Sequence, residues 1–409
     1  MGSSAPIQLS ANEKRLCDII ASRSSKLFDE LKQHVETCTG PTADGNTDGL
    51  DWTRSHFVSR LEKLGATTTL TPGDDRPDWL LSSKKSVAAA LPPTAVCARL
   101  KPDMKRVLIA GHLDTVHADT SPFKALTVSA DGTTATGPGC VDMKGGLVIA
   151  MNALEALDEA GISASWSFLM NSDEETGSYC SARVLESAAR SHDFGLALEP
   201  ALPGGKLAVE RMGSGQFYIE THGRSAHVGR DFASGVSAVT ALAKTLVQID
   251  DIADAETGRI ISVGPIEGGT ATNAVPERAR AWGNARYATQ EIADEIGAKL
   301  DALATSTDAM PSVMVKRSFV RPPKPLIPAT ESLALTAREV AEHLGQSLPF
   351  TSTGGVCDGN NLQAAGLPTI DTLGVRGGGL HTNEEWIELA SLVERCQLLA
   401  VLIHRLSVS

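Results

Sequence analysis

Apolar residues recur at helical spacing through the first part of the chain. Between residues 12 and 64 they return every three or four positions, which predicts a mainly helical segment. The Gly- and Asp-rich stretch 40–49 interrupts this pattern, because glycine and aspartate favour turns over helix interiors. We therefore expect two helices, one on each side of that stretch.

The next region alternates between short apolar runs and amphipathic stretches. Apolar runs at 107–110, 166–170 and 195–198 predict buried strands, and the stretches 143–159 and 178–189 predict helices. Strands that alternate with helices favour an α/β fold, in which helices cover both faces of one sheet.

The pattern changes after about residue 210. Strands and helices are predicted in the order β-α-β-β-α-β, at 216–221, 236–249, 259–264, 279–287, 290–303 and 313–315. That order is typical of the ferredoxin-like split unit. We therefore expect an inserted α+β domain at 211–324, which divides the first domain into residues 1–210 and 325–409. The Pro-rich stretch 321–325 is interpreted as the linker that returns to the first domain.

The composition is that of a folded globular protein with an acidic surface. Apolar residues make up 42% and charged residues 21% of the 409 positions, which is enough apolar material for a sizeable core. The formal net charge of −12 argues against nucleic acid or an anionic membrane as a partner, because both need basic patches. No run of about 18 apolar residues occurs, so we expect no membrane-spanning helix.

The cysteine pattern indicates a reducing compartment. The seven cysteines are an odd number, are scattered, and include no Cys-x-x-Cys pair, so neither a disulfide framework nor a zinc knuckle is expected. Cys140 and Cys357 are expected to be small buried side chains, not nucleophiles. The first 32 residues lack the apolar core of a signal peptide, and the expected location is the cytoplasm.

Several acidic and histidine residues follow predicted strands or Gly-rich turns. They are His112, Asp114, Asp142, Glu174, Glu175, Glu199 and His381. In an extended chain, residues two apart point to the same side, so the Asp114 carboxylate can lie beside the His112 imidazole. A histidine that ligates a metal usually has its second nitrogen held by such a partner. The carboxyl edge of an open α/β sheet is also where ligands bind.

Part of this set suits a pair of metal ions. Two ions that share a carboxylate need about two further nitrogen or oxygen ligands each. The chain supplies these from His112, Asp142, Glu175, Glu199 and His381, with Asp142 suited to the bridging position. Imidazole and carboxylate donors without a thiolate suit two Zn²⁺ ions and would also accept Co²⁺ or Mn²⁺.

Short motifs in this order resemble the M20 metallopeptidase family, and most closely its glutamate carboxypeptidase branch. The motifs lie at 111–116, 137–146, 171–178, 199–200, 223–227 and 377–381. The resemblance implies a mixed-sheet zinc-peptidase catalytic domain with helices on both faces. It also implies that the inserted ferredoxin-like domain acts as a lid and as a dimerisation surface.

The resemblance assigns the metal ligands. One ion would be held by His112, Asp142 and Glu199, and the other by Asp142, Glu175 and His381. Metal polarisation lowers the pKa of a bound water towards about 7, so a carboxylate is basic enough to deprotonate it.

The resemblance also assigns two residues that act on the ligands and the water. Asp114 would orient His112, and Glu174 would be the general base on a metal-bridging water. A base must reach the water without being tied up as a ligand, which separates Glu174 from its neighbour Glu175.

Residues of the inserted domain would complete the site. By the resemblance, His227 reaches into the active site of a partner subunit and stabilises the oxyanion, which implies a homodimer through this domain. Asn273 and Arg286 resemble positions that bind the carboxylate of the substrate. Arginine suits that task because its fork pairs with a carboxylate through two hydrogen bonds.

The expected activity is metal-dependent hydrolysis of an amide bond. The substrate would be a small peptide or an N-acyl amino acid, from which a C-terminal, glutamate-like amino acid is released. An N-deacylase of the acetylornithine deacetylase or aminoacylase type is the alternative, with the same site and a different pocket. A non-catalytic binding protein on the same fold is more remote, because all seven of the acidic and histidine positions are filled.

Overall fold

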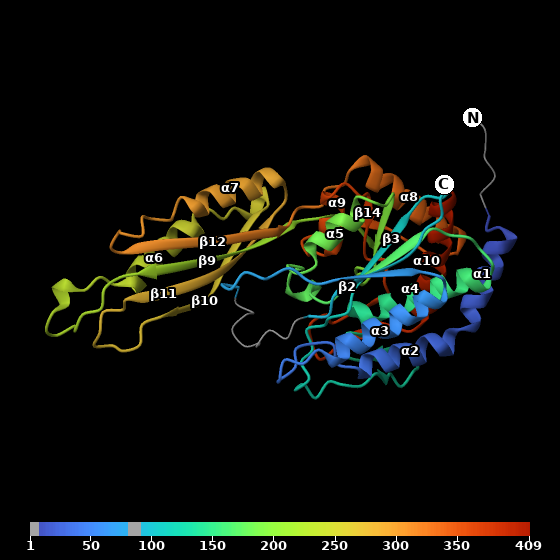
Figure 1. Cartoon of the computed structure of the whole chain (residues 1–409), viewed down its shortest axis with the longest axis horizontal. Coiled ribbons are helices and arrows are strands. Elements are labelled where there is room, and N and C mark those ends of the chain that lie inside the picture. Colours follow the sequence, from blue (N-terminus) through green and yellow to red (C-terminus); the bar gives the residue numbers. More distant parts are fainter. Residues whose placement is uncertain (1–7, 81–90) are drawn as a thin grey trace.

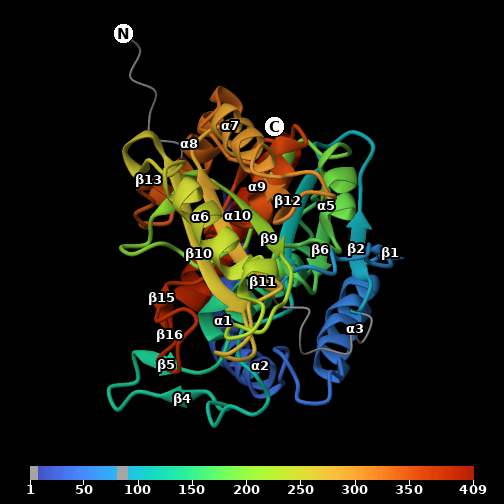
Figure 2. The same ribbon diagram turned by 90° about the vertical axis from the view of Figure 1, so that its left-hand side faces the viewer.

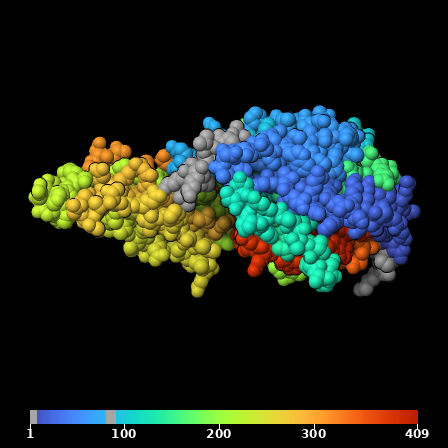
Figure 3. Space-filling view, turned by 90° about the horizontal axis from the view of Figure 1, so that it is seen from below, coloured from blue at the N-terminus to red at the C-terminus, as the bar shows by residue number. Residues whose placement is uncertain are grey.

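The computed structural model describes residues 8–80 and 91–409. Figure 1 shows a larger unit that contains the first and last helices, and a narrower unit that projects from it. Figure 2 views the molecule from the end of the projecting unit, and Figure 3 shows that unit as an elongated arm beside a broad body.

A mixed sheet forms the centre of the larger unit. Its strands lie in the order β1-β2-β6-β3-β7-β14. The strands are β1 (Thr67–Thr71), β2 (Thr94–Arg99), β3 (Val107–His112), β6 (Trp166–Asn171), β7 (Phe194–Ala197) and β14 (Thr369–Ile370). β6, β3, β7 and β14 are mutually parallel, whereas β1 and β2 pair antiparallel at one edge. The predicted mixed α/β fold is therefore confirmed.

Helices cover both faces of this sheet. They are α1 (Ala11–Ser22), α2 (Ser24–Glu36), α3 (Asp48–Lys63), α4 (Gly145–Glu159), α5 (Ala182–Ala189), α8 (Pro328–His343), α9 (Asp358–Ala364) and α10 (Ala390–Val408). Alternate residues of β3 point to opposite faces. Val107 and Ile109 join the large core, while Leu108 and Ala110 join a smaller core beneath α5 and α9.

The N-terminal region differs from the prediction, because three helices replace the expected two. The break that the sequence did not predict lies at Arg23, between α1 and α2. The Arg23 guanidinium donates to the Asn152 carbonyl and forms ion pairs with Glu155 and Glu159 of α4. The chain therefore bends around α4 while its apolar spacing continues, and spacing alone does not reveal such a bend.

The projecting unit follows the predicted order of elements. It contains β9 (Gly213–His222), α6 (Ala238–Asp250), β10 (Arg259–Gly268), β11 (Arg278–Tyr287), α7 (Gln290–Asp301) and β12 (Ser312–Arg321). The antiparallel sheet has the order β10-β11-β9-β12, and the unit has an apolar core of its own. The boundaries at residues 210/211 and 324/325 stay a prediction.

The two chain segments that join the units lie side by side. The main chains of Arg211 and Lys324 exchange two hydrogen bonds of 2.9 and 3.0 Å. Both side chains meet the Asp371 carboxylate, with Arg211 Nη2 at 2.7 Å from Oδ1 and Lys324 Nζ at 3.1 Å from Oδ2. Burial would raise the pKa of Asp371, but the two cations hold it below its ordinary value. Each junction is therefore fixed to the same buried carboxylate.

Smaller elements complete the larger unit. They are β4 (Thr127–Val128), β5 (Thr134–Thr136), β8 (Leu207–Arg211), β13 (Phe350–Thr353), β15 (Gly377–Gly378), β16 (Trp386–Glu388) and the short turns η2 (Cys140–Lys144) and η3 (Glu174–Thr176). Within the described ranges, no helix is both long and apolar enough to cross a membrane.

Candidate active site

The predicted ligands converge at the carboxyl edge of the central sheet. β3 ends at His112, η3 with Glu175 follows β6, and Glu199 follows β7. Because β3 is parallel to both β6 and β7 and hydrogen-bonded to each, these three ends lie side by side. η2 brings Asp142, and the loop after β15 brings His381 to the same place.

These five residues form two groups that share one carboxylate. His112 Nε2 lies 3.3 Å from Asp142 Oδ1 and 3.9 Å from Glu199 Oε1. His381 Nε2 lies 3.6 Å from Asp142 Oδ2 and 3.3 Å from Glu175 Oε2. Within each group the candidate ligand atoms lie within 4.8 Å of one another. Asp142 thus offers a different oxygen to each group, as a bridging carboxylate does.

The donor set fits divalent cations. Among the described residues, His112 Nε2, Asp142 Oδ1 and Glu175 Oε1 are buried and have no hydrogen-bond partner. Buried polar atoms without partners are rare in folded proteins, and metal ions in the two groups would give these atoms partners.

The charges at the site also favour cations. Burial and the neighbouring Glu174 raise the pKa of Glu199 well above its ordinary value. The neighbouring carboxylates of Asp142 and Glu175 raise the pKa of His381 to about 10. Burial would raise the pKa of Asp142 too, but the imidazoles of His112 and His381 beside it keep it low. Each histidine thus lies against carboxylates, the kind of donor that a divalent cation binds.

Glu174 lies beside both groups and belongs to neither. Its side chain is 11% exposed, and burial raises its pKa to about 7 although the neighbouring Arg321 lowers it. Arg321 Nη2 donates to Glu174 Oε1 at 2.7 Å and to the Glu174 carbonyl at 3.1 Å. The Glu174 carboxylate is thus held by a cation and not by the ligand groups.

Arg321 is a site residue that the sequence did not reveal. It is the last residue of β12 and the first residue of the Pro-rich stretch 321–325 that is interpreted as the return linker. Besides Glu174, its guanidinium donates to Asp358 Oδ1 at 3.0 Å and to Ser178 Oγ at 2.9 Å. The Ser178 hydroxyl also donates to Asp358. The linker interpretation was therefore incomplete, because a Pro-rich segment gives no signal of where a preceding side chain reaches.

Asp114 contacts both His112 and the turn that carries Glu174. Its main-chain carbonyl lies 2.9 Å from His112 Nδ1, whereas its carboxylate lies 3.5 Å from that nitrogen. The carboxylate accepts the backbone N–H groups of Glu174 and Glu175 at 3.2 and 3.0 Å. Asp114 therefore contacts the His112 imidazole through its backbone. Its side chain holds the turn that carries Glu174.

Glu385 is a second residue that the sequence did not reveal. Its buried carboxylate accepts the backbone N–H groups of Gly139, Val141 and Asp142 at 2.9 to 3.0 Å. His117 Nε2 lies 2.6 Å from the same carboxylate. Glu385 thus fixes the turn that presents Asp142. In the sequence it stands in an Asn-Glu-Glu run that looks like solvated charge.

The three residues predicted in the projecting unit lie at its two ends. His227 and Asn273 are exposed and adjacent, because the Val228 N–H donates to the Asn273 carbonyl at 3.0 Å. They follow the ends of β9 and β10 that point away from the larger unit (Figure 1). Arg286 lies at the near end of β11, where Arg321 and Glu174 both influence its pKa. The chain thus brings Arg286, but neither of the other two, close to Glu174.

Two cysteines near the site behave as the sequence predicts. Cys140 and Cys357 are fully buried. Burial raises the pKa of both thiols, so both stay protonated. The prediction of small buried side chains is confirmed.

Comparisons with known proteins agree with this geometry. Residues 108–405 match peptidase family M20/M25/M40. The chain is 26% identical to carboxypeptidase G2 of Pseudomonas sp. (strain RS-16) over 370 residues, which cover 88% of this chain and 85% of that protein. It is 27% identical to succinyl-diaminopimelate desuccinylase 2 of Shewanella loihica over 326 residues, which cover 73% and 85% of the two chains.

A solved structure shares the fold. The YXEP protein of Bacillus subtilis, described as a dinuclear metal-binding peptidase of the M20 family, has a TM-score of 0.62 and 16% identity. The match covers 94% of this chain and 98% of that one.

Fold, ligand geometry and sequence matches define this protein as a metal-dependent hydrolase. The chain belongs to peptidase family M20/M25/M40, whose match covers well over half of its length.

Proposed function

We propose that this hydrolase cleaves the amide bond of a small peptide or N-acyl amino acid and releases the C-terminal, glutamate-like amino acid. The observation that carries the proposal is the position of Glu174. It is a buried carboxylate beside two candidate ligand groups, outside both of them, with a pKa of about 7. A general base works best when its pKa lies near the working pH.

The two groups would hold a pair of Zn²⁺ ions, with Co²⁺ or Mn²⁺ as substitutes. His112, Asp142 and Glu199 would hold one ion, and Asp142, Glu175 and His381 the other. When bound, the ions polarise the scissile carbonyl and make water more acidic. The relative of known fold that is described as dinuclear supports a pair of ions in preference to one.

The chain's own residues would handle the proton. Glu174 takes a proton from the attacking water, whose oxygen forms the new bond to the carbonyl carbon. The C–N bond then breaks, and Glu174 passes the proton to the leaving nitrogen. Arg321 holds the Glu174 carboxylate in place, and Asp114 holds its backbone. The carboxylate thus keeps one orientation through both proton transfers.

Glu174→Gln tests this assignment. The variant keeps the shape of the side chain but cannot accept a proton, so kcat should fall by at least about 10²-fold. Elemental analysis should find the same metal content as in the wild type, because Glu174 is outside both ligand groups. Turnover near the wild-type rate would refute Glu174 as the base, and loss of metal would make it a ligand.

Arg286 is the best-placed residue of this chain to bind a substrate carboxylate. Its Nη1 is buried and, among the described residues, has no hydrogen-bond partner. Burial and the neighbouring Arg321 lower the pKa of its guanidinium, and Glu174 partly offsets both. A positively charged group without a partner next to the base suits the carboxylate of a C-terminal amino acid.

An N-deacylase is the second candidate. The desuccinylase relative matches this chain with about the same identity as the carboxypeptidase does, which supports keeping both. A panel of N-acyl glutamates, N-acyl ornithines, succinylated diamino acids and dipeptides would separate them. The hydrolysis rate of a carboxypeptidase would depend on the C-terminal residue that is released, whichever acyl group is attached. The hydrolysis rate of a deacylase would depend mainly on the acyl group.

We further propose a homodimer in which His227, with Asn273 beside it, completes the site of the partner subunit. The support is that both are exposed at the far end of the projecting unit, whereas an oxyanion contact would need them beside the metal ligands. The cytoplasmic location also stays a proposal, based on the scattered cysteines.

A further inference from the structure

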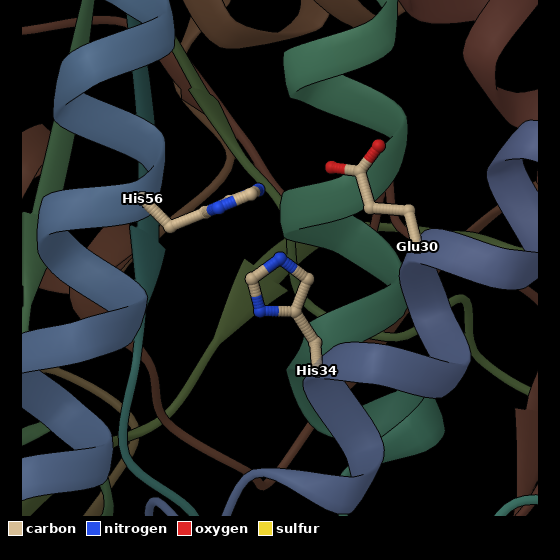
Figure 4. Close-up of side chains that lie close together, drawn as sticks. All are labelled: Glu30, His34 and His56. Carbon is tan, nitrogen blue, oxygen red and sulfur yellow. The ribbon is translucent and has the colours of Figure 1, made fainter.

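A second cluster of potential metal ligands lies between the N-terminal helices, apart from the active site. Glu30 and His34 stand one turn apart on α2, and His56 faces them from α3. Positions i and i+4 of a helix share a face, so Glu30 and His34 project to the same side. Figure 4 shows the Glu30 carboxylate, one His34 nitrogen and the tip of His56 pointing toward one another.

The spacing of this cluster meets the same limit as the two active-site groups. One ligand atom from each residue lies within 4.8 Å of the other two. Ligand atoms around a tetrahedral zinc ion stand about 3.4 Å apart, given Zn–N distances near 2.0 to 2.1 Å. Small side-chain rotations would therefore bring the three atoms to bonding distance.

His34 carries the strongest indication of a missing ligand. Its side chain is only 1% exposed, and in the described part of the chain neither ring nitrogen has a hydrogen-bond partner. A buried polar atom without a partner destabilises the folded state.

Aromatic rings enclose the cluster. The His34 ring stacks on Phe57 with centroids 4.6 Å apart, and the Trp52 ring lies 5.4 Å from it. The His56 ring stacks on Trp52 at 5.1 Å and lies 5.2 Å from the His34 ring, edge to face. These rings pack against both imidazoles and so restrict their orientation, as the surroundings of a metal site do.

We propose that Glu30, His34 and His56 bind one divalent transition-metal cation. Two imidazoles and one carboxylate are a ligand set typical of Zn²⁺ and similar ions, and three protein ligands leave one position for water. Because the ligands come from α2 and α3, the ion would cross-link the two helices. Its role would be to stabilise the N-terminal helices, which lie against α4.

Arg60 is the competitor that the cation must displace. Its Nη1 donates to Glu30 Oε1 and lies 3.3 Å from His56 Nε2, so it holds two of the three ligands. Arg60 has a second partner, because its Nε and Nη2 contact Glu155 Oε1 at 2.9 Å. The Arg60 guanidinium can therefore leave Glu30 and still pair with Glu155. Asn152 Nδ2 donates to the other Glu30 oxygen at 2.9 Å and would continue to orient that carboxylate.

The test is a difference in bound Zn²⁺ between full-length variants with the same active site. Equilibrium dialysis against low-micromolar Zn²⁺ should find one equivalent less in His34→Phe and in His56→Phe than in the wild type. Phenylalanine keeps the ring stacking, and His56 is only half-buried, so at least this variant should fold. His343→Phe, a half-buried histidine on α8, is the matched control and should keep the full content.

Arg60→Gln provides the opposite change. It removes the competing cation, so Zn²⁺ should bind more tightly and raise the melting temperature further than in the wild type. Equal Zn²⁺ content in the wild type and both phenylalanine variants would overturn the proposal. This difference does not depend on how many ions the active site holds, so the result stands whether or not the proposed function is correct.

Discussion

Arg321 connects the proposed base to the projecting unit. It ends β12, and its guanidinium touches the carboxylate and the carbonyl of Glu174. Tyr287 Oη donates to the Arg321 carbonyl at 3.0 Å, which ties the same residue to β11. Because Arg321 also binds Asp358 of the larger unit, the orientation of Glu174 depends on contacts from both units.

Arg321→Lys tests this positioning role. Lysine keeps the positive charge but cannot reach Glu174 and Asp358 together with a planar fork, so kcat should fall by about 10- to 100-fold. KM should change little, because the contact is to the base. Steady-state kinetics on the best substrate would measure the changes in kcat and in KM separately.

A neighbouring arginine provides the control for that variant. Arg317 lies on the same strand and pairs with Asp301 at the surface, so Arg317→Lys should leave both constants unchanged. A rise in KM for Arg321→Lys with unchanged kcat would instead show that Arg321 binds substrate.

Residues of the site differ in how far the sequence could predict them. His112, Asp142 and Glu199 stand at strand ends or in Gly-rich turns, where local pattern and motif single them out as candidates. Arg321 and Glu385 act on Glu174 and on the Asp142 turn, which lie well over a hundred positions away in the chain. No local pattern records such a contact, because the fold alone creates it.

Among the elements, the pair α2 and α3 carries an unusual energetic cost. His34 is buried without a hydrogen-bond partner in the described structure, and its folded-state pKa of about 3 lies far below the unfolded value of 6.5. The folded state thus disfavours protonation. The part of the unfolding free energy that depends on neutral His34 is fully present above pH 6.5. It is lost progressively as the pH falls towards 3.

This linkage predicts a difference between the wild type and His34→Phe. Between pH 6.5 and pH 5 the wild type should lose roughly 1.5 kcal/mol more of its unfolding free energy than the variant. Urea unfolding in EDTA at the two pH values measures the loss of unfolding free energy in each protein. The two proteins have all other titrating groups in common, so the difference between the losses reports on His34. Equal losses of unfolding free energy in the two proteins would mean that the folded state does not disfavour protonation of His34.

Long elements were predicted better than short ones. The helices at 143–159 and 290–303 have sustained apolar stripes, and both appear close to the expected positions as α4 and α7. β1, β8 and β13 were not predicted. They are short strands of four or five residues, and each depends on a partner strand that local periodicity does not specify.

At the scale of the whole molecule, Asp371 fixes the junction between the units. Asp371→Asn would leave Arg211 and Lys324 as buried cations without a carboxylate, so the unfolding free energy should fall by about 3 to 5 kcal/mol. Asp301→Asn removes an exposed ion pair with Arg317 and should cost less than about 1 kcal/mol. Chemical denaturation of both variants measures this contrast, and similar small losses would show that the buried cluster contributes little.

The proposed dimer makes a prediction about mixed subunits. His227→Ala and Glu174→Gln should each be inactive alone. If His227 acts across the interface, a mixed dimer contains one site with both residues intact. Equal mixing makes about half of the dimers mixed, so about a quarter of wild-type activity should return. Activity assays after subunit exchange would detect this. No recovery, with exchange verified by mass spectrometry, would exclude action across the interface.

The side-by-side junction at Arg211 and Lys324 makes the projecting unit a lever. The two attachment points are adjacent and resist sliding, while Trp282 Nε1 adds a hydrogen bond to the Trp79 carbonyl at 2.6 Å. β9 runs outward for ten residues, which corresponds to an arm of about 30 Å. A turn of roughly 20° at the junction would move the far tip by about 10 Å while Arg286, near the pivot, hardly moves. A small rotation would therefore displace His227 much further than Arg286, and the Arg321 contacts to Glu174 and Asp358 would oppose it.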